Sequence, residues 1–403
     1  MIITSLSLSL YWLDLTFAGV MTPPCPVLRA LWIAELHFRC EGAQRPLAAV
    51  EVAAAGNLFK VRQFARRALQ NSTAAAASPR SGQIDAMILL LCGAAAVAVY
   101  AVCCFTVLRL PKCQSRARLD GKTVVVTGSN TGIGKTTALD LAKRGARVIL
   151  ACRDQKRAEA AVSDIRRESG SSEVVYMHLD LASLQSVRSF AETFLKTEPR
   201  LDILINNAGL VVEGTTKDGM GMIFGVNHLG HFLLTLLLLD RLKESGPSRV
   251  VNVASKAYEV GKIDFDCLST HKKLAEGKSS LSLFFRYSHS KLCNVLFTHE
   301  LAKRLQGTNV TCYSLHPGPI KTDISRHSNL LWKMILFPIL TLFFVDPVSG
   351  AQTTIHCALQ EGIEPHSGRY FEKCAVKEVK AHGRDDAVAK KLWELSERLC
   401  SLA

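Results

Sequence analysis

Short β-branched runs alternate with amphipathic stretches through most of the chain, and this alternation limits the possible folds more than any other feature. The run TVVVTG from Thr123 indicates a strand, because branched side chains favour an extended backbone. The next segment, from Ile133, repeats apolar residues at helical spacing and ends at Gly145. Strands that alternate with helices predict parallel pairing with right-handed crossovers. The chain is therefore expected to form an α/β fold.

Further strands are predicted where such runs recur, at 146–153, 173–180, 201–209, 248–255 and 309–318. Helical sequence follows each run, so the crossovers would wind all strands into a single Rossmann-type, doubly wound parallel sheet with helices on both faces. Ligands of such sheets bind beyond the carboxyl ends of the strands. Residues that directly follow a strand are therefore the first place to look for chemistry.

The N-terminal part is organised differently. Residues 1–86 are rich in Ala, Ser and Leu and form a poorly patterned extension. Residues 87–108 carry no charge and are long enough to cross roughly 30 Å of hydrocarbon as a transmembrane helix. The basic juxtamembrane linker at 109–118 favours a cytosolic position for the main domain at 119–403. We therefore predict a single N-terminal membrane anchor, although a buried core helix is the alternative at 87–108 and a cleaved signal peptide the alternative for the first residues.

Composition excludes several classes of site. The 13 cysteines show no paired metal spacing, which predicts reduced thiols and no metal site. The net charge of +14 is spread over many helices without interleaved aromatic residues. That distribution favours attraction to membrane lipid or phosphate over binding of nucleic acid.

The stretch TGSNTGIGKTTA at 127–138 contains parts of two phosphate-binding signatures. Lys135 and Thr136 match the end of the loop of nucleotide triphosphatases, but that loop needs a glycine where Ser129 stands. As a dinucleotide loop, the stretch offers several glycines that let the backbone approach phosphate and a helix that presents free N–H groups. The dinucleotide interpretation is preferred, with a phosphate-loop hydrolase as an alternative.

Several motifs in order resemble the short-chain dehydrogenase/reductase family and its membrane-bound retinol dehydrogenase branch. They are Thr127-Gly128-x-x-x-Gly132-x-Gly134, Asn-Asn-Ala-Gly at 206–209, Ser255 at a strand end, Tyr287-x-x-x-Lys291 and Pro317-Gly318. The resemblance implies a membrane-bound oxidoreductase that interconverts a lipophilic alcohol and its aldehyde or ketone with NADP(H), a retinoid being the first substrate to test. It implies Asn227, Ser255, Tyr287 and Lys291 as catalytic residues, with Ser255 also binding the substrate. It implies cofactor contacts at Gly128, Ser129, Asn130, Gly132, Ile133, Gly134, Asp180, Leu181, Asn207, Ala208, Tyr287, Lys291 and Thr322.

Tyr287 and Lys291 are spaced to lie on one face of one helix. A free tyrosine titrates near pH ~10, and a lysine cation one turn away is expected to lower the pKa of the phenol. Tyr287 would then act as general acid in carbonyl reduction and as general base in alcohol oxidation. Standing alone, such a pair would more often belong to a surface helix.

Arg153 follows the second strand, where an arginine pairs with the extra phosphate of NADP and an acid would accept the ribose hydroxyl of NAD. The next residue, Asp154, would oppose that phosphate only if it pointed inward. Other candidates have simpler alternatives: Ser255 as a helix cap, Asn227 bonded to backbone, and Asp180 capping the helix from Leu184. His228 and His231 are weak evidence for a metal.

Two apolar segments point to a lipophilic substrate and to membrane lipid. The hydrophobic stretch at 329–345 lies where the family places its substrate lid, with a core helix at a subunit interface as the alternative. A C-terminal helix at 385–400 carries an apolar stripe expected to dock on the domain or the membrane. Endoplasmic reticulum or lipid droplet is the expected location, and a homo-oligomer is possible. A low-turnover dinucleotide-binding protein that interacts with membranes or lipid droplets is the alternative function.

Overall fold

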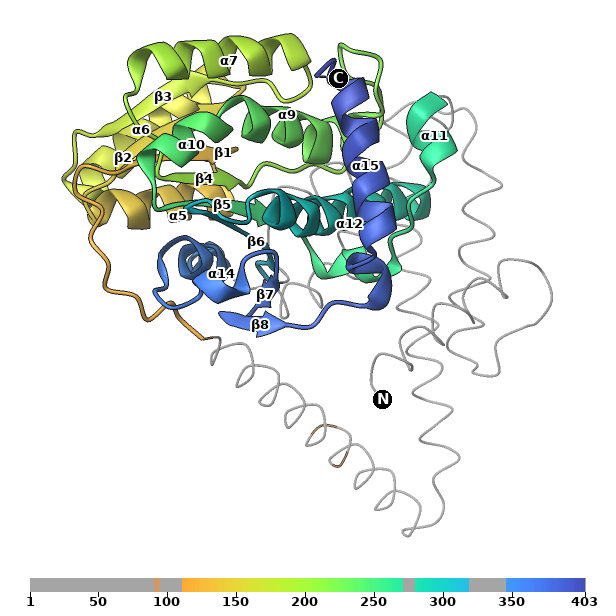
Figure 1. Ribbon diagram of the computed structural model, residues 1–403. Helices are drawn as coiled ribbons and strands as arrows, with labels where there is room; N and C mark the ends of the chain where they lie inside the picture. The colour runs from red at the N-terminus through yellow and green to blue at the C-terminus, as the bar shows by residue number, and fades with distance from the viewer. Residues whose placement is uncertain (1–90, 92, 94–110, 271–279, 319–345, 403) are drawn as a thin grey trace, which may run out of the picture. The chain divides into compact units, whose positions relative to one another are not determined.

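One sheet organises the part of the chain that the computed structural model describes, which is residues 91, 93, 111–270, 280–318 and 346–402 (Figure 1). It has eight strands in the order β3-β2-β1-β4-β5-β6-β7-β8. The strands are β1 Thr123–Thr127, β2 Arg147–Cys152, β3 Val174–His178, β4 Ile203–Asn206, β5 Ser248–Val253, β6 Val310–His316, β7 Tyr370–Glu372 and β8 Ala375–Lys377. β1 to β7 pair in parallel, whereas β8 is antiparallel to β7. The predicted parallel α/β sheet is confirmed.

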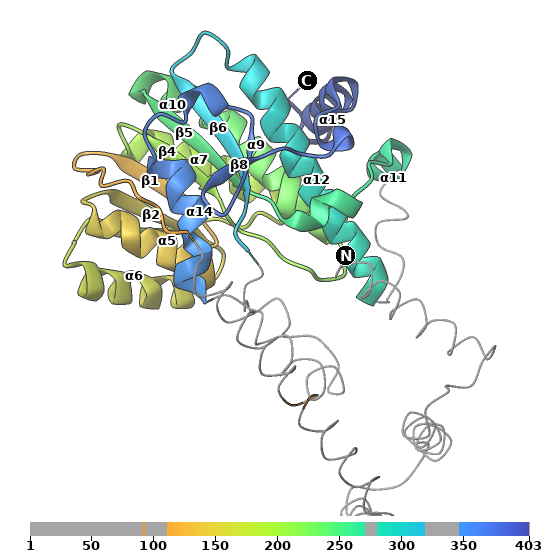
Figure 2. The same ribbon diagram turned by 90° about the horizontal axis from the view of Figure 1, so that it is seen from below.

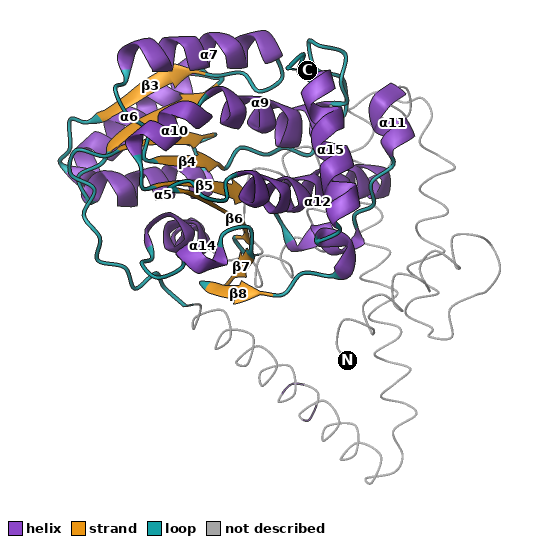
Figure 3. Cartoon of the chain, viewed as in Figure 1, coloured by secondary structure: helices purple, strands orange, loops and turns teal. Residues whose placement is uncertain are grey.

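Helices cover both faces of this sheet (Figure 3). One face packs against α5 Gly132–Lys143, α6 Gln155–Ser169 and α14 Pro347–Leu359. The other face packs against α7 Leu184–Thr197, α9 Gly230–Leu237 and α12 Ser280–Arg304. Shorter elements are α8 Met222–Phe224, the π-helical turn η1 Gly225–Leu229, α10 Leu239–Ser245, η2 Lys256–Val260, α11 Phe265–Thr270, η4 Glu364–His366 and η5 Ala381–Gly383.

Strand β1 shows why the sheet lies between two layers. Val124, Val125 and Val126 are all fully buried. Successive side chains of a strand point to opposite faces, so Val125 joins the core beneath α7, α9 and α12, while its two neighbours join the core beneath α5, α6 and α14. A strand buried on both faces reads as a continuous β-branched run, which is the pattern in the sequence.

The C-terminal helix α15, Asp386–Leu399, lies beside α12 (Figure 2). Its apolar stripe faces the domain: Leu392 and Leu395 are buried in the core, and Val388 and Leu399 pack against it. β7 and β8 were not predicted, because each has only three residues and carries no periodic signal.

The membrane predictions fall mostly outside the described residues. The proposed anchor at 87–108, apart from the helical residues Leu91 and Gly93, and the hydrophobic segment at 329–345 are not described. Within the described part, no single helix has the length and apolar character to cross a membrane. Two helical segments of the described part, Met222–Leu237 and Leu239–Ser245, are together long and apolar enough, but the chain bends by 51° between them.

Candidate active site

The glycine-rich loop joins β1 to α5 at the switch point of the sheet, between β2 and β4. Gly128 and Gly132 both have positive φ, at 63° and 58°, which glycine adopts without strain. A Cβ at position 134 would lie 2.5 Å from Asn207 Nδ2 and 2.6 Å from the carbonyl oxygen of Gly128, so the loop closes only over a glycine there. At Gly132 a Cβ would meet no protein atom within 4 Å, which leaves the approach to the helix N-terminus open to a phosphate.

The other loop residues with predicted cofactor contacts lie at the same turn. Ser129 is buried and donates its hydroxyl to the carbonyl of Val126 at 2.8 Å, so it braces the turn. Asn130 is half-buried, and Ile133 packs into the core beneath α5. The backbone of this turn is therefore held by its own side chains.

Lys135 and Thr136 have ordinary helical roles. Lys135 Nζ forms an ion pair with Asp164 of α6 at 2.6 Å. The Thr136 hydroxyl donates to the carbonyl of Gly132 one turn earlier, at 3.1 Å. Both groups are thus engaged within the helical layer, which disfavours the triphosphatase interpretation.

The loop after β4 is fastened to the end of β1. The backbone N–H groups of Asn207 and Ala208 both donate to Thr127 Oγ1, at 2.9 and 3.0 Å. The Asn207 side chain donates to the carbonyl of Thr127 at 2.9 Å. The Asn-Asn-Ala-Gly segment therefore lies directly against the glycine-rich loop, as a shared binding surface requires.

Asn227 sits in the π-helical turn between α8 and α9 and is fully buried. Its side-chain oxygen accepts from the backbone N–H of Leu210 at 2.9 Å, and its Nδ2 donates to the carbonyl of Leu210 at 3.0 Å. Nδ2 also donates to Ser290 Oγ of α12 at 3.1 Å. The bonds to Leu210 match the predicted alternative, in which Asn227 bonds to backbone. The bond to Ser290 goes further, because it joins the β4 loop to α12.

Lys291 reaches the same place from the middle of α12. Its ammonium donates to the carbonyl of Val253 at 2.8 Å, and the side chain is buried. A Cβ on Gly209 would lie 3.4 Å from Lys291 Nζ and 3.7 Å from Asn227 Oδ1, so a glycine there leaves room between the two groups. Lys291, Asn227 and the β4 loop therefore converge.

Tyr287 lies one turn before Lys291, with the Lys291 ammonium 5.6 Å from the centre of its ring. Its hydroxyl forms a hydrogen bond with Ser255, which follows β5. Ser255 also caps η2 by accepting from the N–H of Ala257 at 3.2 Å, so its predicted alternative role is present too. The pair places a phenol and a hydroxyl together beyond the carboxyl end of β5.

The predicted effect of Lys291 on Tyr287 differs from the structure. Burial raises the pKa of Tyr287 above its ordinary value, and the hydrogen bond from Ser255 opposes that rise. The lysine does not outweigh burial of the phenol: its ammonium donates to the carbonyl of Val253, and burial lowers its own pKa to about 8. The expectation of a lowered phenol pKa is wrong for this arrangement of side chains.

Arg153 and Asp154, at the end of β2, have different surroundings. The Arg153 side chain is exposed and has no ion-pair partner among the described residues. Asp154 is the N-cap of α6, and its carboxylate accepts from the N–H of Arg157 at 3.0 Å. Because the acid is engaged at the helix end, the strand end offers an unpaired guanidinium.

Asp180 and Leu181 follow β3. The carboxylate of Asp180 accepts from the N–H of Ala182 at 3.1 Å and lies 3.4 Å from Lys217 Nζ. The helix after it is capped by Ser183, so the predicted alternative of a capping Asp180 is incorrect. Leu181 is buried against Gly230 of α9. Thr322, the remaining predicted contact, lies outside the described residues.

His231 is a site residue that the sequence reasoning missed. Its Nε2 lies 2.9 Å from Thr127 Oγ1, and its Nδ1 lies 3.3 Å from the carbonyl oxygen of Asn227. It thus connects the glycine-rich loop to the π-helical turn. His228 instead lies between Asn294 and Ser396, and burial lowers the pKa of both histidines, to about 4 for His228 and about 3 for His231. Both are neutral hydrogen-bonding groups, and the described residues contain no cluster of three metal-ligating side chains.

Together these groups fit a dinucleotide with a reacting centre. The open approach over Gly132 suits a pyrophosphate, and Arg153 lies at the neighbouring strand end. Ser255, Tyr287, Lys291 and Asn227 gather on the far side of the switch point, beyond β4 and β5. The arrangement can bind a dinucleotide and exchange a proton beside it.

Comparisons with known proteins agree with this geometry. The family model described as short chain dehydrogenase matches residues 122–277. The chain is 51% identical over 304 residues to dehydrogenase/reductase SDR family member 13 of Bos taurus, covering 75% of this chain and 79% of that protein. It is 50% identical over 292 residues to retinol dehydrogenase 12 of Homo sapiens, covering 72% of this chain and 90% of that protein.

Solved structures show the same fold. A crystal structure of an uncharacterized protein from Mycobacterium paratuberculosis matches with a TM-score of 0.55 and 34% identity, covering 73% of this chain and 97% of that one. The NADP complex of RhlG from Pseudomonas aeruginosa matches with a TM-score of 0.50 and 24% identity, covering 63% of this chain and 95% of that one. With the identity to curated relatives, the motif order and the convergent site, the chain belongs to the short-chain dehydrogenase/reductase family.

Proposed function

We propose that the protein is a membrane-anchored, NADP(H)-dependent oxidoreductase that interconverts a lipophilic alcohol and its aldehyde or ketone. The observation that carries this proposal is the hydrogen bond between Tyr287 and Ser255 beyond β5, beside the buried ammonium of Lys291. These groups can hold and protonate a carbonyl oxygen, and the dinucleotide loop lies across the same sheet edge. Family membership with retinol dehydrogenases supports action on a CH–OH group.

Each side chain has a distinct part in the proposed reduction. The Ser255 hydroxyl donates a hydrogen bond to the substrate carbonyl oxygen, and Tyr287 gives that oxygen its proton. Nicotinamide, when bound, supplies the hydride to the carbonyl carbon, so the product alcohol gains one hydride and one proton. The Lys291 ammonium stabilises negative charge that develops on Tyr287, and Asn227 keeps the β4 loop in place against α12. Oxidation of the alcohol runs the same steps in reverse.

The raised pKa of Tyr287 favours its protonated form, which is the form that carbonyl reduction needs at the start. At neutral pH the residue carries its proton and can act as an acid without prior activation. Acting as a base would require the phenolate, which burial disfavours. Tyr287 is therefore suited to act as the general acid in carbonyl reduction.

The preference for NADP(H) rests on Arg153. Its guanidinium is exposed at the end of β2, while Asp154 is engaged as the cap of α6. A guanidinium without a nearby competing acid is suited to pair with the additional phosphate of NADP. This observation supports NADP over NAD.

An apolar surface near Tyr287 supports a lipophilic substrate and contact with membrane lipid. Leu281, Phe284 and Phe285 in the first turns of α12 are 60%, 46% and 42% exposed. Clustered exposed apolar side chains of this kind indicate a binding surface. Because they precede Tyr287 on the same helix, a lipid-soluble substrate could reach the catalytic residues from that side.

Turnover tests the reaction. Purified full-length protein with retinal and NADPH is expected to form retinol, and Tyr287→Phe should reduce kcat by about 10²-fold or more, as loss of a general acid predicts. Tyr176→Phe, which removes a phenol hydroxyl that bonds to His178 on β3, away from the site, is the matched control. Equal activity of Tyr287→Phe and wild type would refute the proposed proton transfer. Absence of turnover in wild type, with NADPH still bound, would favour the low-turnover binding protein.

Glycosylation tests the proposed membrane topology. The sequence contains acceptor sequons at Asn71-Ser72-Thr73 and Asn309-Val310-Thr311. With a single anchor at 87–108 and a cytosolic catalytic domain, only the first sequon would face the lumen. Expression in microsomes with Asn71→Gln and Asn309→Gln variants distinguishes the two acceptors, and modification at Asn309 would overturn the orientation.

A further inference from the structure

Two buried serines of α12, Ser288 and Ser290, lie outside the proposed catalytic set. Each hydroxyl donates to a backbone carbonyl of its own helix, that of Ser288 to Phe284 at 2.8 Å and that of Ser290 to Tyr287 at 2.7 Å. Ser290 has a further contact, because its oxygen also accepts from Asn227 Nδ2 at 3.1 Å. Ser290 is therefore bonded both to the turn of α12 that carries Tyr287 and to the π-helical turn η1.

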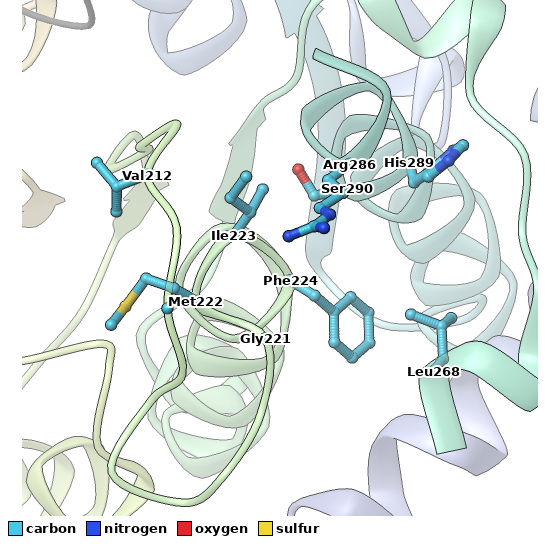
Figure 4. A pocket seen from close by; sticks show the side chains of 10 residues that line it. Val212, Gly221, Met222, Ile223, Phe224, Leu268, Arg286, His289 and Ser290 are labelled. Atoms are coloured by element: carbon cyan, nitrogen blue, oxygen red, sulfur yellow. The ribbon is translucent and has the colours of Figure 1, made fainter. Parts of the chain in front are cut away.

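Ser290 lies where α12 packs against α8 and η1. Figure 4 shows it across from Ile223 of α8 and next to Arg286 of its own helix. The cavity at this contact has room for about one water molecule, so the two elements are closely packed here. A hydrogen bond across such a contact restricts how far the two elements can shift relative to each other.

Both amide protons of Asn227 are used in this arrangement. One goes to the carbonyl of Leu210 and the other to Ser290 Oγ, while Oδ1 accepts from the N–H of Leu210. The bonds to Leu210 hold the β4 loop, whereas the bond to Ser290 reaches α12. Ser290 thus connects the fixed side chain of Asn227 to the backbone at Tyr287.

Lys291, the next residue, holds α12 in a second direction. Its ammonium donates to the carbonyl of Val253 at the end of β5, at 2.8 Å. Adjacent residues of an α-helix project about 100° apart, so the contacts of Ser290 and Lys291 restrain different sides of the helix. Both lie about one turn after Tyr287, whose hydroxyl bonds to Ser255 beyond β5. Together they set the rotation and the height of α12 at Tyr287.

We propose that Ser290 is a positioning residue, which holds Tyr287 at the height along α12 where its hydroxyl meets Ser255. This inference rests on the proposed reaction, because Ser290 acts through the proton transfer of Tyr287. Displacement of a reacting group by about 1 Å can lower a rate by about 10²-fold. The contacts that hold the glycine-rich loop, such as those of Thr127 with the β4 loop, do not involve Ser290. Loss of the Ser290 hydroxyl should therefore affect kcat and not dinucleotide binding.

Steady-state kinetics with retinal and NADPH tests the inference on the full-length protein in phosphatidylcholine nanodiscs. Ser290→Ala should lower kcat by about 10-fold or more and change the KM for NADPH by less than about 2-fold. Ser288→Ala is the matched control, because it removes an equally buried hydroxyl whose bond to Phe284 stays within the helix. It should leave both parameters near the wild-type values. Equal kcat for Ser290→Ala and wild type would overturn the inference.

Hydrogen exchange measures the same contact without turnover. The N–H of Leu210 is bonded to Asn227 Oδ1, so exchange at this amide reports how firmly Asn227 is held. Ser290→Ala should speed this exchange by about 5-fold, as loss of one hydrogen bond predicts, and Ser288→Ala should leave it unchanged.

The two measurements separate this inference from the proposed function. Faster exchange at Leu210 in Ser290→Ala without loss of kcat would make Ser290 a structural residue only. Unchanged exchange in Ser290→Ala would overturn the inference even if the wild type reduced no retinal. Absence of turnover in the wild type would count against the proposed reaction, whereas the exchange rates would still decide whether Ser290 holds Asn227.

Discussion

Lys291 Nζ donates to the carbonyl oxygen of Val253 at 2.8 Å, which ties the middle of α12 to the end of β5. The ammonium that makes this contact is buried, and burial lowers the pKa of Lys291 to about 8. The folded protein therefore carries an unfavourable charge at neutral pH, and this charge lies 5.6 Å from the centre of the Tyr287 ring. We regard the resulting loss of stability as a consequence of its role in the site.

The stability of the folded protein should depend on this lysine between pH 8 and 10.5. Below about pH 8 both the folded and the unfolded states carry the proton, and the full penalty for the buried charge applies. Between the folded pKa of about 8 and the unfolded value near 10.5, only the unfolded state keeps the proton, so the free energy of unfolding rises with pH. The rise should approach about 3 kcal/mol, at roughly 1.4 kcal/mol per pKa unit.

Lys291→Met isolates that contribution. Urea unfolding of wild type and variant without cofactor, at several pH values from 7 to 10, gives the difference in free energy of unfolding. We expect the variant to be the more stable protein at pH 7 and to lose that advantage by pH 10. A difference independent of pH would show that Lys291 keeps an ordinary pKa.

Replacing Arg153 should change cofactor preference. Arg153→Ala removes the exposed guanidinium at the end of β2, so kcat/KM with NADPH should fall by about 10- to 100-fold, as loss of a charge-assisted contact predicts. The value with NADH should change little. Arg167→Ala on α6 removes another exposed cation, which is paired with Asp164, and it is the matched control. A wild-type preference for NADH would contradict the assignment.

Lys135 distinguishes a dinucleotide loop from a triphosphatase loop. Its partner is Asp164 at 2.6 Å, both side chains being about one-third exposed. Such a pair contributes about 0–1 kcal/mol, so Lys135→Met should change the KM for NADPH by no more than about 3-fold. A triphosphatase lysine would bind the phosphate directly, and its loss would abolish nucleotide binding. Equilibrium binding of NADPH and of ATP with Mg²⁺ to both proteins decides between them.

The sequence pattern predicted the first six strands of the sheet. Each of them either is buried on both faces, which gives a continuous apolar run, or follows a segment with a clear helical pattern. The pattern also placed Gly128, Asn207, Ser255 and Tyr287 just after strands or on one helix. The spacing of residues along a helix cannot show where a side chain points. The spacing of Tyr287 and Lys291 therefore led to the prediction that the lysine lowers the pKa of the phenol. The ammonium instead points to Val253, a residue distant in sequence.

Other features left no trace in the sequence pattern. Asp154 was ambiguous until its carboxylate was found to cap α6. His231 was considered only as a weak metal ligand, because its contact with Thr127 joins segments far apart in the chain.

The Thr127–His231 contact gives the last prediction. Thr127 Oγ1 already accepts from two backbone N–H groups, of Asn207 and Ala208, so its own proton is free to be donated. His231 Nε2 at 2.9 Å is a nearer acceptor for it than the carbonyl oxygen of Ile205 at 3.4 Å. His231 Nδ1 then donates to the carbonyl of Asn227. His231→Leu removes both side-chain contacts and leaves the threonine proton only the longer contact to Ile205, which should lower the free energy of unfolding by about 1–3 kcal/mol.

A double-mutant cycle tests whether the two residues act as one unit. Thr127→Val removes the same contact from the other side, so the double variant should lose less stability than the sum of the single losses, by about 1 kcal/mol. Because the pKa of His231 is about 3, this coupling should be the same at pH 5.5 and pH 8. Urea unfolding at both pH values measures it. Additive losses would show that His231 stabilises α9 by packing alone, and a coupling that changes between the two pH values would show that the ring titrates there.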